Sequence, residues 1–112
     1  MTDRDATLHE IKERIVALVL EKGWSENGIQ NPQHVAMAMT VEMSELLEHF
    51  QWLNAEDVDA MLAGSDRERV ALIAEECADV MIYGLQLCYS LNIDLAAEIE
   101  RKLRIVRNRA DG

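Results

Sequence analysis

The sequence is poor in the residues that make tight turns, because its 112 residues include one proline and five glycines. A β-sandwich needs a turn about every 8–12 residues, so this scarcity argues against such a fold. Aromatic residues make up 4% of the chain, whereas Ala, Leu, Met, Glu and Arg, all good helix formers, are plentiful. We therefore expect an all-α protein, and the length predicts a single domain over residues 1–112.

Basic residues are also scarce, with 11 Lys and Arg against 21 Asp and Glu and a net charge of -10. A surface of this charge repels nucleic acids and anionic membranes, so we expect neither as a partner. The charge does not exclude a ligand that carries phosphates, provided that a divalent cation lies between the two sets of negative charges.

The chain has two cysteines, Cys77 and Cys88, and no apolar signal segment in its first ten residues. Both cysteines fall in one predicted helix, about 16 Å apart along its axis, which is too far for a disulfide. We expect them to be inert core residues. Reduced cysteines and the absence of a signal segment together predict a cytoplasmic location.

Hydrophobic periodicity predicts four main helices joined by short connections, and a short helical turn between the second and the third. Long helices with short connections are typical of an antiparallel four-helix bundle, which is the architecture we expect. Residues 110–112 are expected to fray. The four helices are predicted over residues 6–22, 32 to 51 or 52, 65–91 and 95–108, and the short turn over residues 55–62.

Capping residues support these boundaries. Asn31 and Pro32 stand where the second helix begins, as cap and first helical residue. Ser65 and Glu68 have the spacing of a capping box at the start of the third helix. Asp94 can cap the fourth helix.

The third predicted helix is apolar around most of its circumference, so we expect it to be buried. One narrow arc differs and could be a plain solvent-facing side. An exposed face usually mixes Lys and Arg among its acids, however, and this helix has no basic residue between Val70 and Leu91. A bound cation would offset the repulsion between like charges. The arc holds Glu75, Glu76, Asp79, Tyr83 and Gln86.

The second predicted helix carries a similar acidic pair. Glu42 and Glu45 are three residues apart on one face, partly among apolar neighbours, and Glu76 and Asp79 have the same spacing. If the two helices pack antiparallel, the four carboxylates can converge, and ligand sets of oxygen atoms suit Mg²⁺ or Mn²⁺. Glu48, one turn beyond Glu45, either helps to position a metal or a water molecule or is simply an exposed acid.

With these acids the chain resembles the MazG-like branch of the all-α nucleoside triphosphate pyrophosphohydrolase superfamily, and it is similar to the dCTP pyrophosphatase group. The family signature is E-x-x-E followed, some tens of residues later, by E-x-x-D. Glu42, Glu45, Glu76 and Asp79 fill this signature, and the segment Phe50-Gln51-Trp52 makes the match more specific. The likeness covers nearly the whole chain.

The resemblance implies an enzyme that hydrolyses a nucleoside triphosphate between its α and β phosphates, giving the monophosphate and pyrophosphate. It implies Mg²⁺ bound by the four signature acids, and dCTP or another standard or modified deoxynucleotide as substrate. It also implies an intertwined homo-oligomer, a homotetramer built as a dimer of dimers. The acid that activates the attacking water stays open among Glu42, Glu45 and Glu48.

The resemblance further implies a set of substrate contacts: the two Trp residues for the base, a Tyr as another contact, and a basic C-terminal segment with its Asn for the phosphates or the sugar. Each has a structural alternative, since Trp residues often lie at core edges and arginines favour helix C-termini. Gln30 stands where the dCTP pyrophosphatase group often has His, which leaves the preferred base open. The implied contacts are Trp24, Trp52, Tyr83, Arg104, Asn108 and Arg109.

A function of another class also fits the sequence. A non-enzymatic helical oligomer, or a regulatory protein, could carry the same acids as an ordinary surface stripe. Incubation with Mg²⁺ and each triphosphate, followed by an assay for pyrophosphate, separates the two interpretations.

Overall fold

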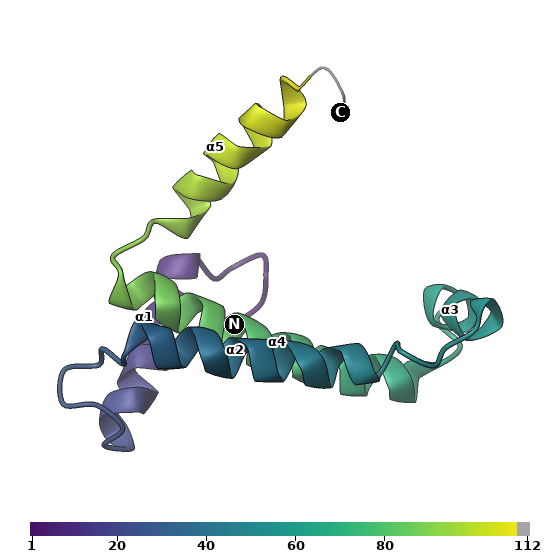
Figure 1. The fold of residues 1–112 in the computed structure, drawn as a ribbon, viewed down its shortest axis with the longest axis horizontal. Helices are drawn as coiled ribbons and strands as arrows, with labels where there is room; N and C mark the ends of the chain where they lie inside the picture. The colour runs from purple at the N-terminus through teal and green to yellow at the C-terminus, as the bar shows by residue number, and fades with distance from the viewer. Residues whose placement is uncertain (110–112) are drawn as a thin grey trace. The chain divides into compact units, whose positions relative to one another are not determined.

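The computed structural model describes residues 1–109, and among these residues it contains five α-helices and no β-strand (Figure 1). The prediction of an all-α protein is therefore confirmed. The fraying expected for residues 110–112 lies outside the described residues. The helices are α1 (Leu8–Glu21), α2 (Pro32–Glu48), α3 (Ala55–Leu62), α4 (Arg67–Ser90) and α5 (Leu95–Arg107).

The chain divides into two compact units. The first unit comprises residues 1–32 together with the chain from Leu85 onward, and the second comprises residues 33–84. The first unit therefore holds α1, the last residues of α4, and α5, whereas α2, α3 and most of α4 belong to the second. Within the described part of the chain, no helix has both the length and the apolar character needed to cross a membrane.

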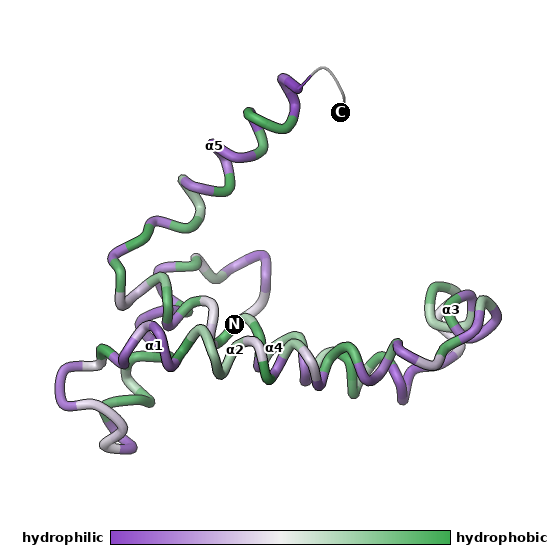
Figure 2. The backbone as a smooth tube through the Cα atoms, viewed as in Figure 1, coloured by the Kyte–Doolittle hydropathy of each residue, from purple (hydrophilic) through white to green (hydrophobic). Residues whose placement is uncertain are grey.

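The first unit has a small core to which α1 and the end of α4 contribute. Val16 and Val19 of α1 are buried, as are Leu85 and Cys88 of α4. Burial of aliphatic side chains of this size contributes about 1.5–3 kcal/mol each to stability. Helix α5 lies beyond this core, and apolar and polar residues alternate along it (Figure 2).

Local hydrogen bonds explain where α1 and α5 begin. The Thr7 hydroxyl accepts a hydrogen bond from the first turn, so α1 begins at Leu8 and not at the predicted Ala6. Asp94 caps α5 as predicted, because its carboxylate accepts a hydrogen bond from the backbone N–H of Ala97 at 3.1 Å.

The predicted capping box of the third main helix is wrong by one residue. The backbone N–H of Arg69 donates to Asp66 Oδ1 at 3.2 Å, so Asp66 caps α4. The hydroxyl of Ser65 instead donates to the carbonyl oxygen of Ala60 at 3.0 Å. Two capping candidates stood side by side in the sequence, and the preceding helix α3 engages the first of them.

Helix α2 ends earlier than predicted, at Glu48 rather than at residue 51 or 52. The backbone N–H of Phe50 donates to the carbonyl oxygen of Leu47 at 2.9 Å. This bond spans three residues, as in a 3₁₀ turn, whereas an α-helix needs four. The short turn predicted over residues 55–62 is a true helix, α3, which begins with a capping box between Asn54 and Asp57.

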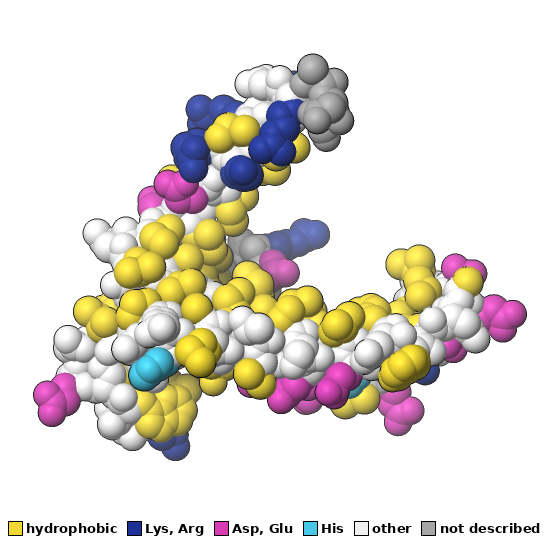
Figure 3. All heavy atoms as spheres, viewed as in Figure 1, with side chains coloured by type: hydrophobic (Ala, Val, Ile, Leu, Met, Phe, Trp, Pro, Cys, Tyr) yellow, Lys and Arg dark blue, Asp and Glu magenta, His cyan; other side chains and the backbone are white. Residues whose placement is uncertain are grey.

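The prediction that the third main helix is buried is wrong for the single chain. Val70, Leu72 and Met81 of α4 are 43%, 52% and 52% exposed. Hydrophobic side chains are visible at the surface of the second unit in Figure 3. Cys88 is buried as expected, but Cys77 is exposed, and both cysteines are free. The apolar surface of α4 therefore has more area than one copy of the chain covers.

Candidate metal centre

Helices α2 and α4 run side by side and antiparallel in the second unit (Figure 1). A Cβ atom added to Gly84 would lie 3.2 Å from Met39 Cε, so the Met39 side chain of α2 packs against α4 at Gly84. Further along, His49 Nε2 lies 3.8 Å from Glu76 Oε1. Positions that rise along α2 thus face positions that fall along α4, which is the arrangement that the acidic pairs need in order to meet.

Three of the four predicted metal ligands come together between these helices. Glu42, Glu45 and Glu76 each offer a carboxylate oxygen, and these three oxygens all lie within 4.8 Å of one another. The spacing of three residues places Glu42 and Glu45 on one face of α2, and Glu76 approaches from α4. Glu42 and Glu76 are partly buried, and Glu45 is exposed. We call these three residues the glutamate cluster.

Asp79, the fourth predicted ligand, lies at the border of the glutamate cluster. It is exposed and is not among the three residues whose oxygens lie within 4.8 Å of one another. Its charge is nevertheless close enough to affect Glu42. The structure therefore places Asp79 beside the cluster, three residues after Glu76 on α4.

The electrostatics of the cluster act mainly on Glu42. Its pKa is raised above the ordinary value of 4.5, first because partial burial removes water from the carboxylate. The negative charge of Glu45 and a hydrogen bond with the Glu45 side chain raise the pKa further, and the charges of Asp79 and Glu76 add to the effect. Each of these causes disfavours a negative charge on Glu42, and a bound cation would counter all of them.

Two oxygens of the cluster are unsatisfied in a way that fits a cation. Glu42 Oε2 and Glu76 Oε2 are buried and have no hydrogen-bond partner within residues 1–109. A buried polar atom without a partner is costly, and native structures seldom leave one. The donor set consists of carboxylate oxygens, which Mg²⁺ and Mn²⁺ prefer. The residues present therefore fit a divalent cation.

His49 is a member of this site that the sequence interpretation did not assign. It follows the last residue of α2, and its side chain is 26% exposed beside that of Glu76, which is 22% exposed. The available signal was periodicity, since Glu42, Glu45 and His49 are spaced at i, i+3 and i+7 and share a helical face.

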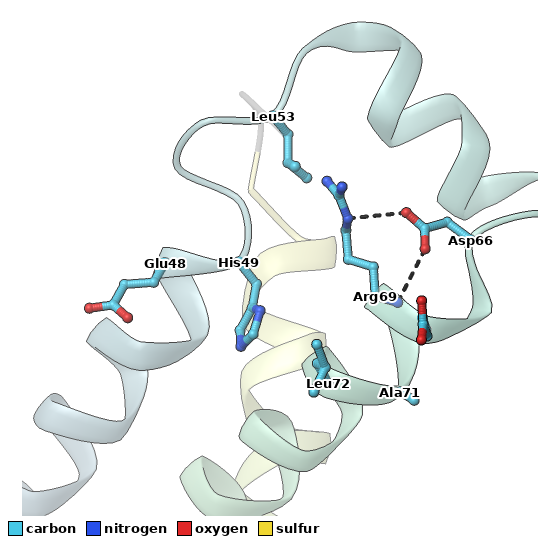
Figure 4. Close-up of a pocket in the computed structure, with 8 residues that line it drawn as sticks. Glu48, His49, Leu53, Asp66, Arg69, Ala71 and Leu72 are labelled. Atoms are coloured by element: carbon cyan, nitrogen blue, oxygen red, sulfur yellow. Dashed lines mark hydrogen bonds and ion pairs between the residues drawn. The ribbon is translucent and has the colours of Figure 1, made fainter.

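Glu48 is exposed and takes no part in the glutamate cluster. It borders an open groove of about 750 Å³ that is also lined by His49, Leu53 and the start of α4 (Figure 4). On the α4 side of the groove, Asp66 and Arg69 face each other, with Arg69 Nε 3.1 Å from Asp66 Oδ2. This groove lies next to the cluster, because His49 lines the groove and its Nε2 lies 3.8 Å from Glu76 Oε1.

The predicted substrate contacts of the second unit differ in exposure. Trp52 lies in the turn after α2 and is 85% exposed. Tyr83 lies one helical turn after Asp79 on α4 and is partly buried. The structure brings neither of them into the glutamate cluster.

The remaining predicted contacts belong to the first unit. Trp24 is 59% exposed and follows the helix stop at Gly23, where φ is +69°. On α5 Arg104 forms an ion pair with Glu100 at 2.6 Å, and Lys and Arg side chains gather over this helix in Figure 3. Asn108 and Arg109, which follow α5, are exposed.

Comparison with known proteins identifies the family to which the chain belongs. A model of the MazG-like family matches residues 37–110, a segment that contains the glutamate cluster, and the chain belongs to this family. The resemblance drawn from the two acidic pairs is thereby confirmed.

The chain is also similar to particular curated proteins. Over 105 residues it is 31% identical to dCTP pyrophosphatase 1 from Homo sapiens, covering 94% of this chain and 59% of that protein. It is 31% identical over 105 residues to dCTP pyrophosphatase 1 from Bos taurus, with 94% and 60% covered. The protein of that name from Rattus norvegicus is 30% identical over 105 residues, with 94% and 59% covered. The chain thus spans about three-fifths of the length of the relatives it matches.

Proposed function

We propose that the protein is a Mg²⁺-dependent nucleoside triphosphate pyrophosphohydrolase that acts on dCTP or on another standard or modified deoxynucleoside triphosphate. The observation that carries this proposal is the glutamate cluster, with oxygens from two antiparallel helices within 4.8 Å of one another. Membership of the MazG-like family and the similarity to dCTP pyrophosphatases support it.

In this proposal Glu42, Glu45, Glu76 and Asp79 hold the cation. When bound, a divalent cation supplies positive charge that neutralises a triphosphate and lowers the pKa of water. The carboxylates fix where that charge lies, because α2 and α4 hold them at opposite sides of one small space. Asp79 completes the set from the exposed side, where a substrate can enter.

The chain itself must also supply a proton acceptor for the attacking water. Glu42, Glu45 and Glu48 remain the candidates, and each lies on α2 within two helical turns of the others. Attack on the α phosphorus breaks the bond to the bridging oxygen, and the products are the monophosphate and pyrophosphate. From the sequence resemblance, Trp24 and Trp52 are proposed to contact the base, since stacking on an aromatic ring contributes about 1–3 kcal/mol. The roles of Tyr83, Arg104, Asn108 and Arg109 as further substrate contacts rest on the same resemblance.

We also propose that the chain works as one functional domain within a homo-oligomer, a dimer of dimers. Helix α4 runs without a break through both compact units, which supports a single domain. The exposed apolar side chains of α4 and α5, among them Met81, Ile99 and Leu103, supply surface that a second copy can cover.

The proposal is tested by incubating the protein with Mg²⁺ and each nucleoside triphosphate in turn, and by separating the products. We expect monophosphate and pyrophosphate, with no diphosphate. Glu45→Ala and Asp79→Ala should each remove the activity while circular dichroism stays unchanged. Asp59→Ala, which removes an exposed acid from α3, is the matched control and should keep full activity. Absence of pyrophosphate with every triphosphate would favour a non-enzymatic helical oligomer instead.

A further inference from the structure

The two oxygens of Glu76 lie in different surroundings. Oε1 faces His49, with Nε2 at 3.8 Å, whereas Oε2 is buried without a hydrogen-bond partner among the described residues. The carboxylate therefore has one oxygen toward an imidazole and one that is free to serve the glutamate cluster.

The distance of 3.8 Å is too long for a hydrogen bond, whose usual range is about 2.7–3.2 Å. Hydrogen bonds of this kind are often long in the unliganded protein and tighten when the ligand is bound. Both side chains are about three-quarters buried, so water competes little for the contact.

His49 is placed to act on the cation site through Glu76 and not as a ligand. The atoms that lie within 4.8 Å of one another belong to Glu42, Glu45 and Glu76, and His49 is not among them in the described structure. Carboxylates that bind metals are commonly held by an outer hydrogen-bond donor, and loss of that donor weakens metal binding about 10–100-fold.

We propose that His49 is a positioning residue: its Nε2–H holds Glu76 Oε1 and thereby fixes the other oxygen of Glu76 toward the divalent cation. This inference rests on the proposed function, because it assumes that the glutamate cluster binds a cation. It adds a residue outside the E-x-x-E and E-x-x-D signature, located where α2 ends. The early end of α2 matters here, since it sets the backbone from which the imidazole reaches α4.

The test measures metal binding and not turnover. MnCl₂ is titrated into the full chain at one fixed pH, and free Mn²⁺ is followed by its six-line electron paramagnetic resonance signal. His49→Leu removes the donor and should weaken Mn²⁺ binding about 10–100-fold. His49→Gln keeps an N–H near the position of Nε2 and should retain most of the affinity. His49→Asn has the same amide on a shorter side chain, cannot reach Glu76, and should behave like His49→Leu.

The first unit offers a matched control. His9 and Glu13 form a pair of the same residue types, with His9 Nε2 2.8 Å from Glu13 Oε1, but both are exposed and neither belongs to the cluster. His9→Leu should leave Mn²⁺ binding unchanged. If His49→Leu fails to fold, the comparison of His49→Asn with His49→Gln still decides, because both introduce the same polar group.

The outcomes separate this inference from the proposed function. If the unmodified protein binds Mn²⁺ and all His49 variants bind it equally well, or all lose affinity equally, the positioning role is wrong while the cation site stands. If the unmodified protein neither binds Mn²⁺ nor releases pyrophosphate, the proposed function itself fails.

Discussion

Single carboxylates decide whether this molecule can hold a cation, and Glu42 is the most informative of them. It is partly buried, it has an oxygen without a hydrogen-bond partner in the described structure, and it faces three other acids. Its charge is therefore unfavourable in the folded, metal-free protein and less so in the unfolded chain, where the neighbours disperse.

The raised pKa of Glu42 predicts a pH-dependent stability. Below its ordinary pKa of 4.5 the group is protonated in both states and costs nothing. As the pH rises through the raised pKa, the folded state binds more protons than the unfolded state, so stability is lost. Glu42→Gln carries no charge at this position and escapes this loss. The free energy of unfolding of Glu42→Gln minus that of the unmodified protein should therefore increase between about pH 4 and about pH 8.

Urea unfolding of both proteins in a chelator at the two pH values measures this difference. A difference that is the same at both pH values would contradict the electrostatic account of Glu42. Addition of Mg²⁺ at the higher pH should stabilise the unmodified protein, because a ligand that binds only the folded state stabilises it by mass action.

Gly28 and Gly64 both lie in loops with a positive φ, and alanine substitutions there should differ in their effect on stability. Gly28 has φ +80° and a Cβ added there would lie 2.5 Å from Val16 Cγ1, whereas Gly64 has φ +77° and open space around it. Both alanine variants carry the strain of the left-handed conformation, about 1–2 kcal/mol. Only Gly28→Ala adds a clash in the core, worth about 1–3 kcal/mol more. Thermal or urea unfolding that ranks Gly64→Ala as the more harmful change would refute this packing of the loop against α1.

At the scale of elements, the loop before α2 is tied to the end of α4 by an amide pair. Gln86 is 9% exposed, and its Nε2 donates to Gln30 Oε1 at 2.8 Å. The Ser90 hydroxyl contacts the backbone oxygens of Gln30 and Gln86 at 3.3 and 3.0 Å. These bonds fix the loop residue Gln30 against the end of α4.

The amide pair makes a non-additive prediction. Gln30→Leu leaves the buried amide of Gln86 without its partner and should lower the free energy of unfolding by about 1–3 kcal/mol. The double variant Gln30→Leu with Gln86→Leu removes both polar groups and should recover part of that loss. A double variant whose loss equals the sum of the two single losses would show that the pair is not coupled.

Most helix positions could be predicted from the sequence, because the signals that begin and end a helix lie in neighbouring residues. Periodicity and the cap at Asp94 located the helices, and the spacing of three residues placed each acidic pair on one face. The end of α2 was not predictable in this way, because the pattern of apolar residues continues to Phe50 while the backbone turns after Glu48. His49 was missed for the related reason that its partner Glu76 lies on another helix, 27 positions along the chain.

At the scale of the whole molecule, the burial of α4 was predicted from its apolar circumference, and the single chain leaves much of that surface exposed. The apolar pattern of α4 indicates which side chains avoid water. It does not indicate whether the same chain or a second copy covers them. Exposed apolar residues on α2 and α4, such as Met37, Val41 and Leu72, are 62%, 57% and 52% exposed. Surfaces of this kind mark sites of association.

Association can be measured directly. We expect light scattering to give a mass above that of one 12.7 kDa chain at micromolar concentration, with a tetramer as the specific prediction. Leu103→Glu, which places a charge on the exposed apolar side of α5, should lower that mass if α5 contributes to the contact. A single-chain mass at micromolar concentration would contradict the proposed oligomer.

The central claim is that acids from two antiparallel helices hold one divalent centre, and anomalous diffraction from crystals soaked with Mn²⁺ tests it most directly. The account predicts an anomalous peak bounded by the carboxylates of Glu42, Glu45, Glu76 and Asp79. Anomalous peaks found only elsewhere, with these four carboxylates free of metal at saturating Mn²⁺, would contradict it.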